Sequence, residues 1–175
     1  MSRISLVSPE KASPEVETIY AEISQAFGKI PNLFKAYAHH PPLLEANWHK
    51  VKRVMMEGVL ARKTKEAIAL LVSQDNGCTY CVAAHTGALK MVGVSDDEIG
   101  RISADLDQAD FSVKERALIR LARKANAAAH EVTAAEVDAV RQTGAGDAEI
   151  VEALGVMEVF TAFNKFLDVL DVDLG

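Results

Sequence analysis

The sequence has no long apolar run, no surplus of basic residues and only two cysteines, and each of these absences argues against a class of protein. No apolar run reaches the roughly 18 residues that a membrane-spanning helix needs, so we expect no membrane partner. The net charge of −6 argues against nucleic-acid binding, which requires a basic stripe. The first twelve residues are polar and mixed in charge, unlike a secretory signal peptide, so we expect a cytoplasmic protein.

Almost every segment of the 175 residues follows a helical pattern, and no convincing strand is present. Glycines 28, 58 and 93 stop three of the expected helices. A hydrophobic content of 49% is enough for a real core, which argues against disorder. The sequence therefore predicts an all-α protein, with its first helices over residues 14–27, 41–57, 62–74 and 78–91, and a short apolar-aromatic piece over 33–38.

Later helix starts are marked by capping boxes, in which a Ser or Thr is followed three residues later by Glu. The pairs are Ser95 with Glu98, Ser112 with Glu115, and Thr133 with Glu136.

A faint internal repeat relates two parts of the chain at an offset of about fifty residues. Residues 65–68 resemble 114–117, and 93–99 resemble 144–150. Chance similarity between helical segments is the alternative. We predict one domain over 1–175, with N-terminal helices over about 1–57, a motif-bearing core over about 58–105 and a degenerate second repeat over about 106–175.

The chemistry-bearing feature is Cys78-Thr79-Tyr80-Cys81, which we place at the first turn of a helix. Free amides and the positive end of the helix dipole stabilise a thiolate there. His85 lies one turn after Cys81 on the same face, where it can take or relay a proton. Glu66 lies on the preceding helix, and a helical hairpin would fold it back against His85 as a base or an orienting group.

Each of these residues also has a simpler interpretation. A lone His85 is more often a hydrogen-bonded structural residue, Glu66 a solvated first-turn carboxylate, and Tyr80 a packing residue. Cys78, Cys81, His85 and Glu66 are also four conceivable metal ligands, but structural zinc takes Cys and His from two knuckles and no second knuckle exists. Two cysteines three positions apart would close too small a loop for a stabilising disulfide. Redox chemistry is the interpretation that uses the whole set.

The spacing Glu66-x11-Cys78-x2-Cys81-x3-His85 resembles the signature of the alkylhydroperoxidase D (AhpD)-like group of the carboxymuconolactone decarboxylase superfamily, in its peroxidase-related branch. The likeness covers nearly the whole chain. Further matching stretches are 30–34 with Pro41, 61–66, 93–99, 111–118 and 163–166.

The resemblance implies an AhpD-like helical bundle that assembles as a trimer or hexamer. It implies that Cys81 is the peroxidatic thiol, Cys78 the resolving and more exposed one, and His85 with Glu66 the proton relay. It requires no cofactor and no metal. AhpD itself carries a histidine where this chain has Tyr80, which leaves Tyr80 as an auxiliary candidate and puts thiolate activation and the reductant in doubt.

The expected function is thiol-dependent reduction of hydrogen peroxide or an organic hydroperoxide, with an external thiol or a reductase restoring the cysteines. Two alternatives stay open. One is an acid-base enzyme of the carboxymuconolactone decarboxylase type, whose chemistry gives no reason for Cys-x-x-Cys. The other is a non-enzymatic redox-sensing or disulfide-exchange oligomer.

Overall fold

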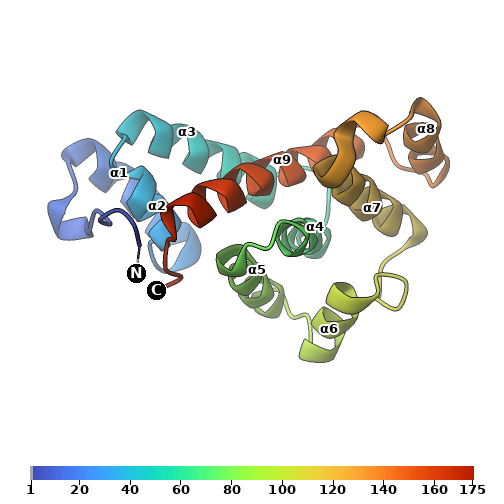
Figure 1. Ribbon diagram of the computed structural model, residues 1–175, viewed down its shortest axis with the longest axis horizontal. Coiled ribbons are helices and arrows are strands. Elements are labelled where there is room, and N and C mark those ends of the chain that lie inside the picture. The colour runs from blue at the N-terminus through green and yellow to red at the C-terminus, as the bar shows by residue number, and fades with distance from the viewer. Residues whose placement is uncertain (1) are drawn as a thin grey trace.

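The computed structural model describes residues 2–175 as helices joined by short turns, with no strand in that range (Figure 1). The predicted all-α class is therefore confirmed. The elements in chain order are η1 (Pro9–Lys11), α1 (Pro14–Phe27), α2 (Asn32–Tyr37), α3 (Pro41–Val51), η2 (Lys52–Met56), α4 (Arg62–Asp75), α5 (Thr79–Met91), α6 (Asp96–Ala104), α7 (Val113–Ala128), η3 (Ala129–Glu131), α8 (Ala134–Gln142) and α9 (Asp147–Leu170).

Two of the three expected capping boxes form completely, at Ser112 and Thr133. The third is only half formed, which corrects the prediction. Ser95 Oγ accepts the Glu98 amide, but the Glu98 carboxylate turns away to accept the Asp110 amide at 2.7 Å. Tertiary partners therefore take a side chain that local sequence assigns to the cap.

The helix expected over 41–57 changes character near its end. It is α-helical to Val51 and then widens into the π-helical turn η2 before Gly58, whose φ is 100°. The last carbonyls of a helix lack partners within it. Arg62 Nη1 donates to the Met55 carbonyl at 3.2 Å, and Lys65 Nζ donates to the Glu57 carbonyl. Side chains of α4 therefore terminate this helix.

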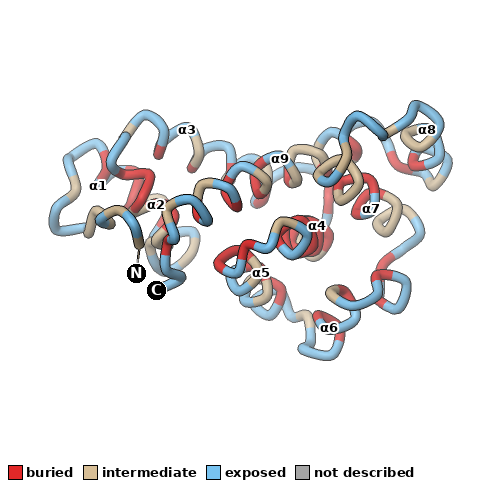
Figure 2. Tube along the Cα trace, in the orientation of Figure 1, coloured by how far each residue is buried: buried red, intermediate tan, exposed pale blue. Residues whose placement is uncertain are grey.

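Helix α4 is the centre of the molecule (Figures 1 and 2). All ten residues from Thr64 to Ser73 are buried, although the sequence there includes a threonine, a lysine, a glutamate and a serine. A helix that is buried all round must be enclosed by other elements. Helices α5, α7 and α9 pack against it, and α9 runs along the long axis of the molecule from the α1–α3 end to the α7–α8 end.

The two segments related by the predicted repeat share local geometry. Gly93 and Gly144 both have positive φ, 85° and 91°, and each lies just before the start of a helix, α6 or α9. The subdivision of the chain into two helical halves stays a prediction.

No helix in residues 2–175 combines the length and apolarity needed to cross a membrane.

Candidate active site

The α4–α5 hairpin carries all four motif residues. After Asp75, Gly77 turns the chain with a φ of 75°, and the Cys78 amide donates to the Ser73 carbonyl at 3.0 Å. Cys78 is the N-cap residue of α5 rather than its first helical residue. The tight turn makes the two helices antiparallel neighbours, so residues at similar distances from it face one another.

That geometry brings Glu66 and His85 together. His85 Nδ1 lies 2.6 Å from Glu66 Oε2, and Arg62 Nε donates to Glu66 Oε1 at 2.6 Å. Glu66 is 1% exposed, so it is not the solvated carboxylate of the simpler interpretation. The Phe160 ring packs edge-on against the imidazole, with 4.2 Å between ring centroids. The carboxylate therefore uses both oxygens to fix the imidazole and one guanidinium.

The Glu66 carboxylate is held as an anion despite its burial. Burial alone raises its pKa, but the hydrogen bond and charge of His85 and the Arg62 guanidinium together outweigh it and hold the pKa below its usual value. When Nδ1 donates to the carboxylate, Nε2 is the nitrogen left to accept a proton. The pair is thus arranged as an oriented base.

Both cysteines are free thiols at the start of α5, and they hydrogen-bond with each other. Hydrogen bonds from the Cys81 thiol and the Cys81 amide lower the pKa of Cys78. The same contact with Cys78, together with burial, raises the pKa of Cys81. Of the two thiols, Cys78 is therefore the one whose thiolate is favoured.

The expectation that Cys78 is the more exposed cysteine is wrong for this chain. Cys78 is 0% exposed and Cys81 is 3% exposed. Cys78 lies at the junction of the two helices, and Asp168 of α9 hydrogen-bonds with its sulfur from outside the hairpin. Helix α9 therefore covers a residue that an isolated hairpin would leave open.

Within residues 2–175, His85 forms no direct hydrogen bond to either sulfur. Its imidazole hydrogen-bonds with Glu66 instead. One turn of helix separates it from Cys81, as the sequence spacing indicates. A proton passing from Cys81 to His85 would therefore need a bridging water or a ring rotation. At 8% exposure His85 is the most accessible of the four motif residues.

Several residues at the site were not predicted from the sequence: Arg62, Ser73, Asn164 and Asp168. The spacing of Arg62, four residues before Glu66, is a signal for an ion pair on one helix face. Asn164 and Asp168 also lie four residues apart, on α9, but nothing local shows which helix they face.

The Tyr80 hydroxyl hydrogen-bonds with α2, and both thiols lie near enough to influence its ionisation. The phenol oxygen accepts the Leu33 amide of α2 at 3.2 Å. Burial raises the pKa of Tyr80, so the group stays a neutral phenol at ordinary pH. The side chain therefore connects the start of α5 to the start of α2.

Replacing Tyr80 by phenylalanine tests this structural role. The Leu33 amide would lose its acceptor, so we expect a loss of about 1–2 kcal/mol in the free energy of unfolding, measured by urea denaturation. The rate of thiol oxidation by hydroperoxide should stay within about twofold of the unchanged protein. A slower rate at intact stability would instead give the hydroxyl a part in the chemistry.

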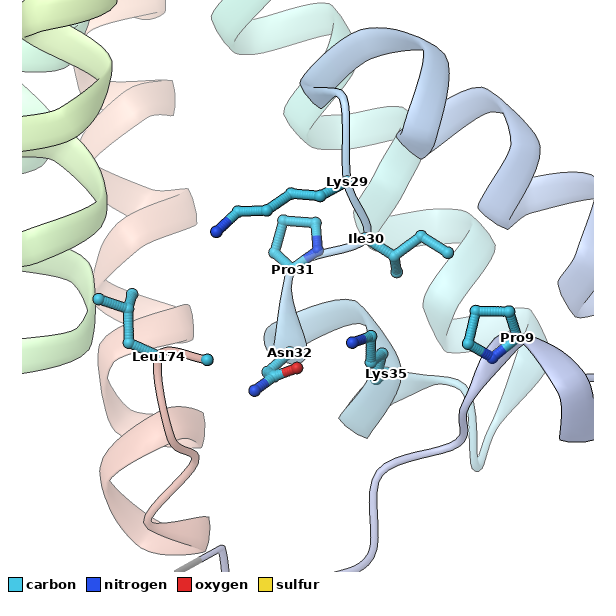
Figure 3. Close-up of a pocket in the computed structure, with 8 residues that line it drawn as sticks. Pro9, Lys29, Ile30, Pro31, Asn32, Lys35 and Leu174 are labelled. Carbon is cyan, nitrogen blue, oxygen red and sulfur yellow. The ribbon is translucent and has the colours of Figure 1, made fainter.

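A pocket of about 190 Å³ lies between the segment joining α1 to α2 and the C-terminal tail, where Lys29, Pro31 and Asn32 face Leu174 (Figure 3).

Residues 2–175 contain no group of three or more His, Cys, Asp or Glu side chains arranged to hold a metal ion, so the metal interpretation has no geometric support.

The fold places the chain in a structural class. It superimposes with a TM-score of 0.89 on a crystal structure described as the alkylhydroperoxidase AhpD core, a peroxidase-related protein from Ralstonia eutropha, at 24% identity over 99% of this chain and 92% of that one. A peroxidase-related protein from Silicibacter sp. gives a TM-score of 0.88 at 23% identity, with 99% and 92% coverage. The AhpD-like fold predicted from the motif is confirmed.

Residues 41–124, which include all four motif residues, match the model of the Carboxymuconolactone decarboxylase family. A Mycobacterium tuberculosis protein named alkyl hydroperoxide reductase is 32% identical over 96 residues, which are 55% of this chain. The match spans only 28% of that relative's length.

Proposed function

We propose that this chain reduces hydroperoxides with the Cys78–Cys81 pair, using Glu66 and His85 as its proton relay. The observation that carries the proposal is the Glu66–His85 contact of 2.6 Å on the same helical hairpin as two hydrogen-bonded free thiols. The alkyl hydroperoxide reductase relative supports the same reaction class. The hairpin supplies a nucleophile, a second thiol and an oriented base within one buried site.

In the proposed first step the Cys81 thiolate attacks the outer oxygen of the hydroperoxide. Before attack, the Cys81 proton moves along the thiol–thiol hydrogen bond to Cys78 or through a water to His85. The sulfur–oxygen bond forms as the oxygen–oxygen bond breaks, and the departing alkoxide takes a proton to become an alcohol. Cys81 is thereby oxidised to a sulfenic acid and the peroxide is reduced.

In the second step Cys78 attacks the sulfenic sulfur. The Cys78 thiol loses its proton, the hydroxyl leaves as water, and a disulfide joins the two residues. An external dithiol or a reductase then restores both thiols by exchange. This cycle needs no metal and no organic cofactor. Because both sulfurs are buried, we propose that peroxide reaches them past His85, the most exposed member of the site.

The direct test counts thiols. The reduced protein, freed of reductant, receives one equivalent of tert-butyl hydroperoxide, and free thiols and intact mass are followed from seconds to minutes. We expect two thiols to be lost with a mass decrease of about 2 Da, because a disulfide forms by removal of two hydrogens. Persistence of both thiols would refute the proposal and favour acid-base chemistry at Glu66 and His85.

Two matched variants assign the roles of the cysteines. Cys81→Ser should lose no thiol, because the remaining sulfur belongs to the resolving residue. Cys78→Ser should lose one thiol and gain about 16 Da, because the sulfenic acid has no resolving partner and can be trapped with dimedone. The reverse pattern would make Cys78 the peroxidatic residue. Stoichiometric oxidation without turnover in the presence of a dithiol would identify a redox sensor.

We also propose that the chain acts as a homo-oligomer, a trimer or hexamer as the family resemblance implies. Several large apolar side chains are exposed on the isolated chain, among them Val59, Met91, Val113, Val151 and Val169. Burial between subunits would remove such side chains from water. Light scattering coupled to size exclusion measures the state directly.

A further inference from the structure

We propose that the Ser73 hydroxyl and the Asn164 amide are catalytic residues that stabilise the Cys81 thiolate by hydrogen bonding to its sulfur. The catalytic meaning of this assignment rests on the proposed function, in which Cys81 is the attacking group. Both residues lie outside the Glu-Cys-Cys-His motif, one on α4 and the other on α9.

The two donors form a pair around one sulfur. Ser73 and Asn164 are both 0% exposed, and hydrogen bonding by each side chain acts to lower the pKa of Cys81 against the larger effects that raise it. Asn164 Nδ2 also donates to Ser73 Oγ at 3.0 Å. Because the serine oxygen already accepts this bond, its own hydrogen is free to point at sulfur. Ser73 also accepts the Cys78 amide through its carbonyl, so one residue contacts both halves of the redox pair.

A chain of amides fixes which end of Asn164 faces Ser73. Asn76 Nδ2 donates to Asn164 Oδ1 at 2.9 Å, so the amide nitrogen of Asn164 is the end that faces Ser73, where it donates to Oγ. Asn76 Oδ1 in turn accepts Asn126 Nδ2 at 2.9 Å, and Thr161 donates to Asn126 Oδ1 at 2.6 Å. Asn76 Nδ2 also donates back to Asn126 Oδ1 at 3.2 Å, so the two asparagines hold each other in place and fix the donor that faces Asn164.

Cys81 needs such donors more than Cys78 does. Its contact with Cys78 and its burial both disfavour the thiolate, and His85 gives it no direct hydrogen bond. Neutral donors fixed in a buried site favour an adjacent anion without bringing a further charge into the core. Ser73 keeps its proton throughout and only donates a hydrogen bond. The same donors would face the sulfur when attack on peroxide begins.

The test measures the thiolate itself. In a Cys78→Ser background, Cys81 is the single thiol of the chain, and its absorbance near 240 nm is titrated against pH. The same titration of a variant with both cysteines replaced by serine is subtracted to remove tyrosine ionisation. Ser73→Ala should raise the Cys81 pKa by about one unit, a tenfold loss of thiolate below that pKa. Asn164→Leu, which removes both the direct donor and the partner of the hydroxyl, should raise it at least as much.

Thr161→Val is the matched control. It removes a hydroxyl from the far end of the same network, one that hydrogen-bonds with Asn126 and Met157 and with neither cysteine, and should leave the Cys81 pKa within about 0.3 units. Unchanged pKa values in both Ser73→Ala and Asn164→Leu, with urea unfolding showing folded proteins, would overturn the assignment and leave the network a purely structural one. This titration uses no peroxide, so its result does not depend on the proposed function. If the substitutions shift the Cys81 pKa but the protein does not consume hydroperoxide, only the proposed function is refuted.

Discussion

Glu66→Gln is expected to slow the oxidation of Cys81 by hydroperoxide by about two orders of magnitude, the lower end of the range for a positioned acid-base group. The glutamine amide oxygen can still accept a hydrogen bond from His85 Nδ1, so the ring should keep its place. What disappears is the negative charge that stabilises a protonated imidazole. Single-turnover thiol quenching with excess tert-butyl hydroperoxide measures the rate.

Glu98→Gln is the control for this substitution. Glu98 is another buried carboxylate whose pKa is held below its usual value, here against burial, by the Asp110 amide, Arg101 and Lys63, and none of these partners is a cysteine. Its neutralisation should lower stability and leave the oxidation rate within about twofold. Equal oxidation rates in Glu66→Gln and the unchanged protein would remove Glu66 from the relay.

The largest stability effect is expected at the ion pair of Lys65 and Glu152. Lys65 is 2% exposed and Glu152 12% exposed at the side chain, and the two are in direct contact. Glu152 Oε2 also accepts the Val59 and Leu60 amides at 2.6 and 3.3 Å. Gly58, with its φ of 100°, lets the chain pass against this carboxylate, because a Cβ there would collide with it. Glu152 therefore connects α9 both to Lys65 of α4 and to the segment before α4.

Glu152→Gln should lower the free energy of unfolding by about 3–5 kcal/mol, because it leaves the Lys65 ammonium buried without its counter-charge. Lys65→Met should cost less than Glu152→Gln, since Glu152 keeps two amide donors. Urea unfolding of the two single variants and the double variant gives the coupling energy.

Glu158→Gln provides the comparison on the same helix. Glu158 pairs with Lys50 at 2.8 Å on the surface, with side chains 66% and 42% exposed, so its loss should cost less than about 1 kcal/mol. A Glu152→Gln effect as small as this one would show that Lys65 sheds its charge or reaches water when its partner is neutralised.

The sequence alone determined the helices and the contact between Glu66 and His85 across the hairpin. Apolar spacing and the Gly28 and Gly77 turns fix local backbone choices, which depend on neighbours a few residues away. The contact between Glu66 and His85 is predictable for the same reason. A tight turn between two helices leaves few ways for the helices to pack against each other. Where a distant partner competed, local inference gave a wrong result, as with the Glu98 carboxylate that leaves its capping box.

Only the tertiary structure decided which groups surround the sulfurs. Asn164 lies 83 positions after Cys81 in the sequence, and its amide meets Ser73 because α9 packs across α4. The burial of Cys78 and the pairing of Lys65 with Glu152 likewise come from α9. The helical pattern shows that α9 has a buried face but not which helix that face meets. That choice depends on side-chain packing over the whole chain, and it adds Asp168 and Asn164 to the groups that influence the pKa values of the two thiols.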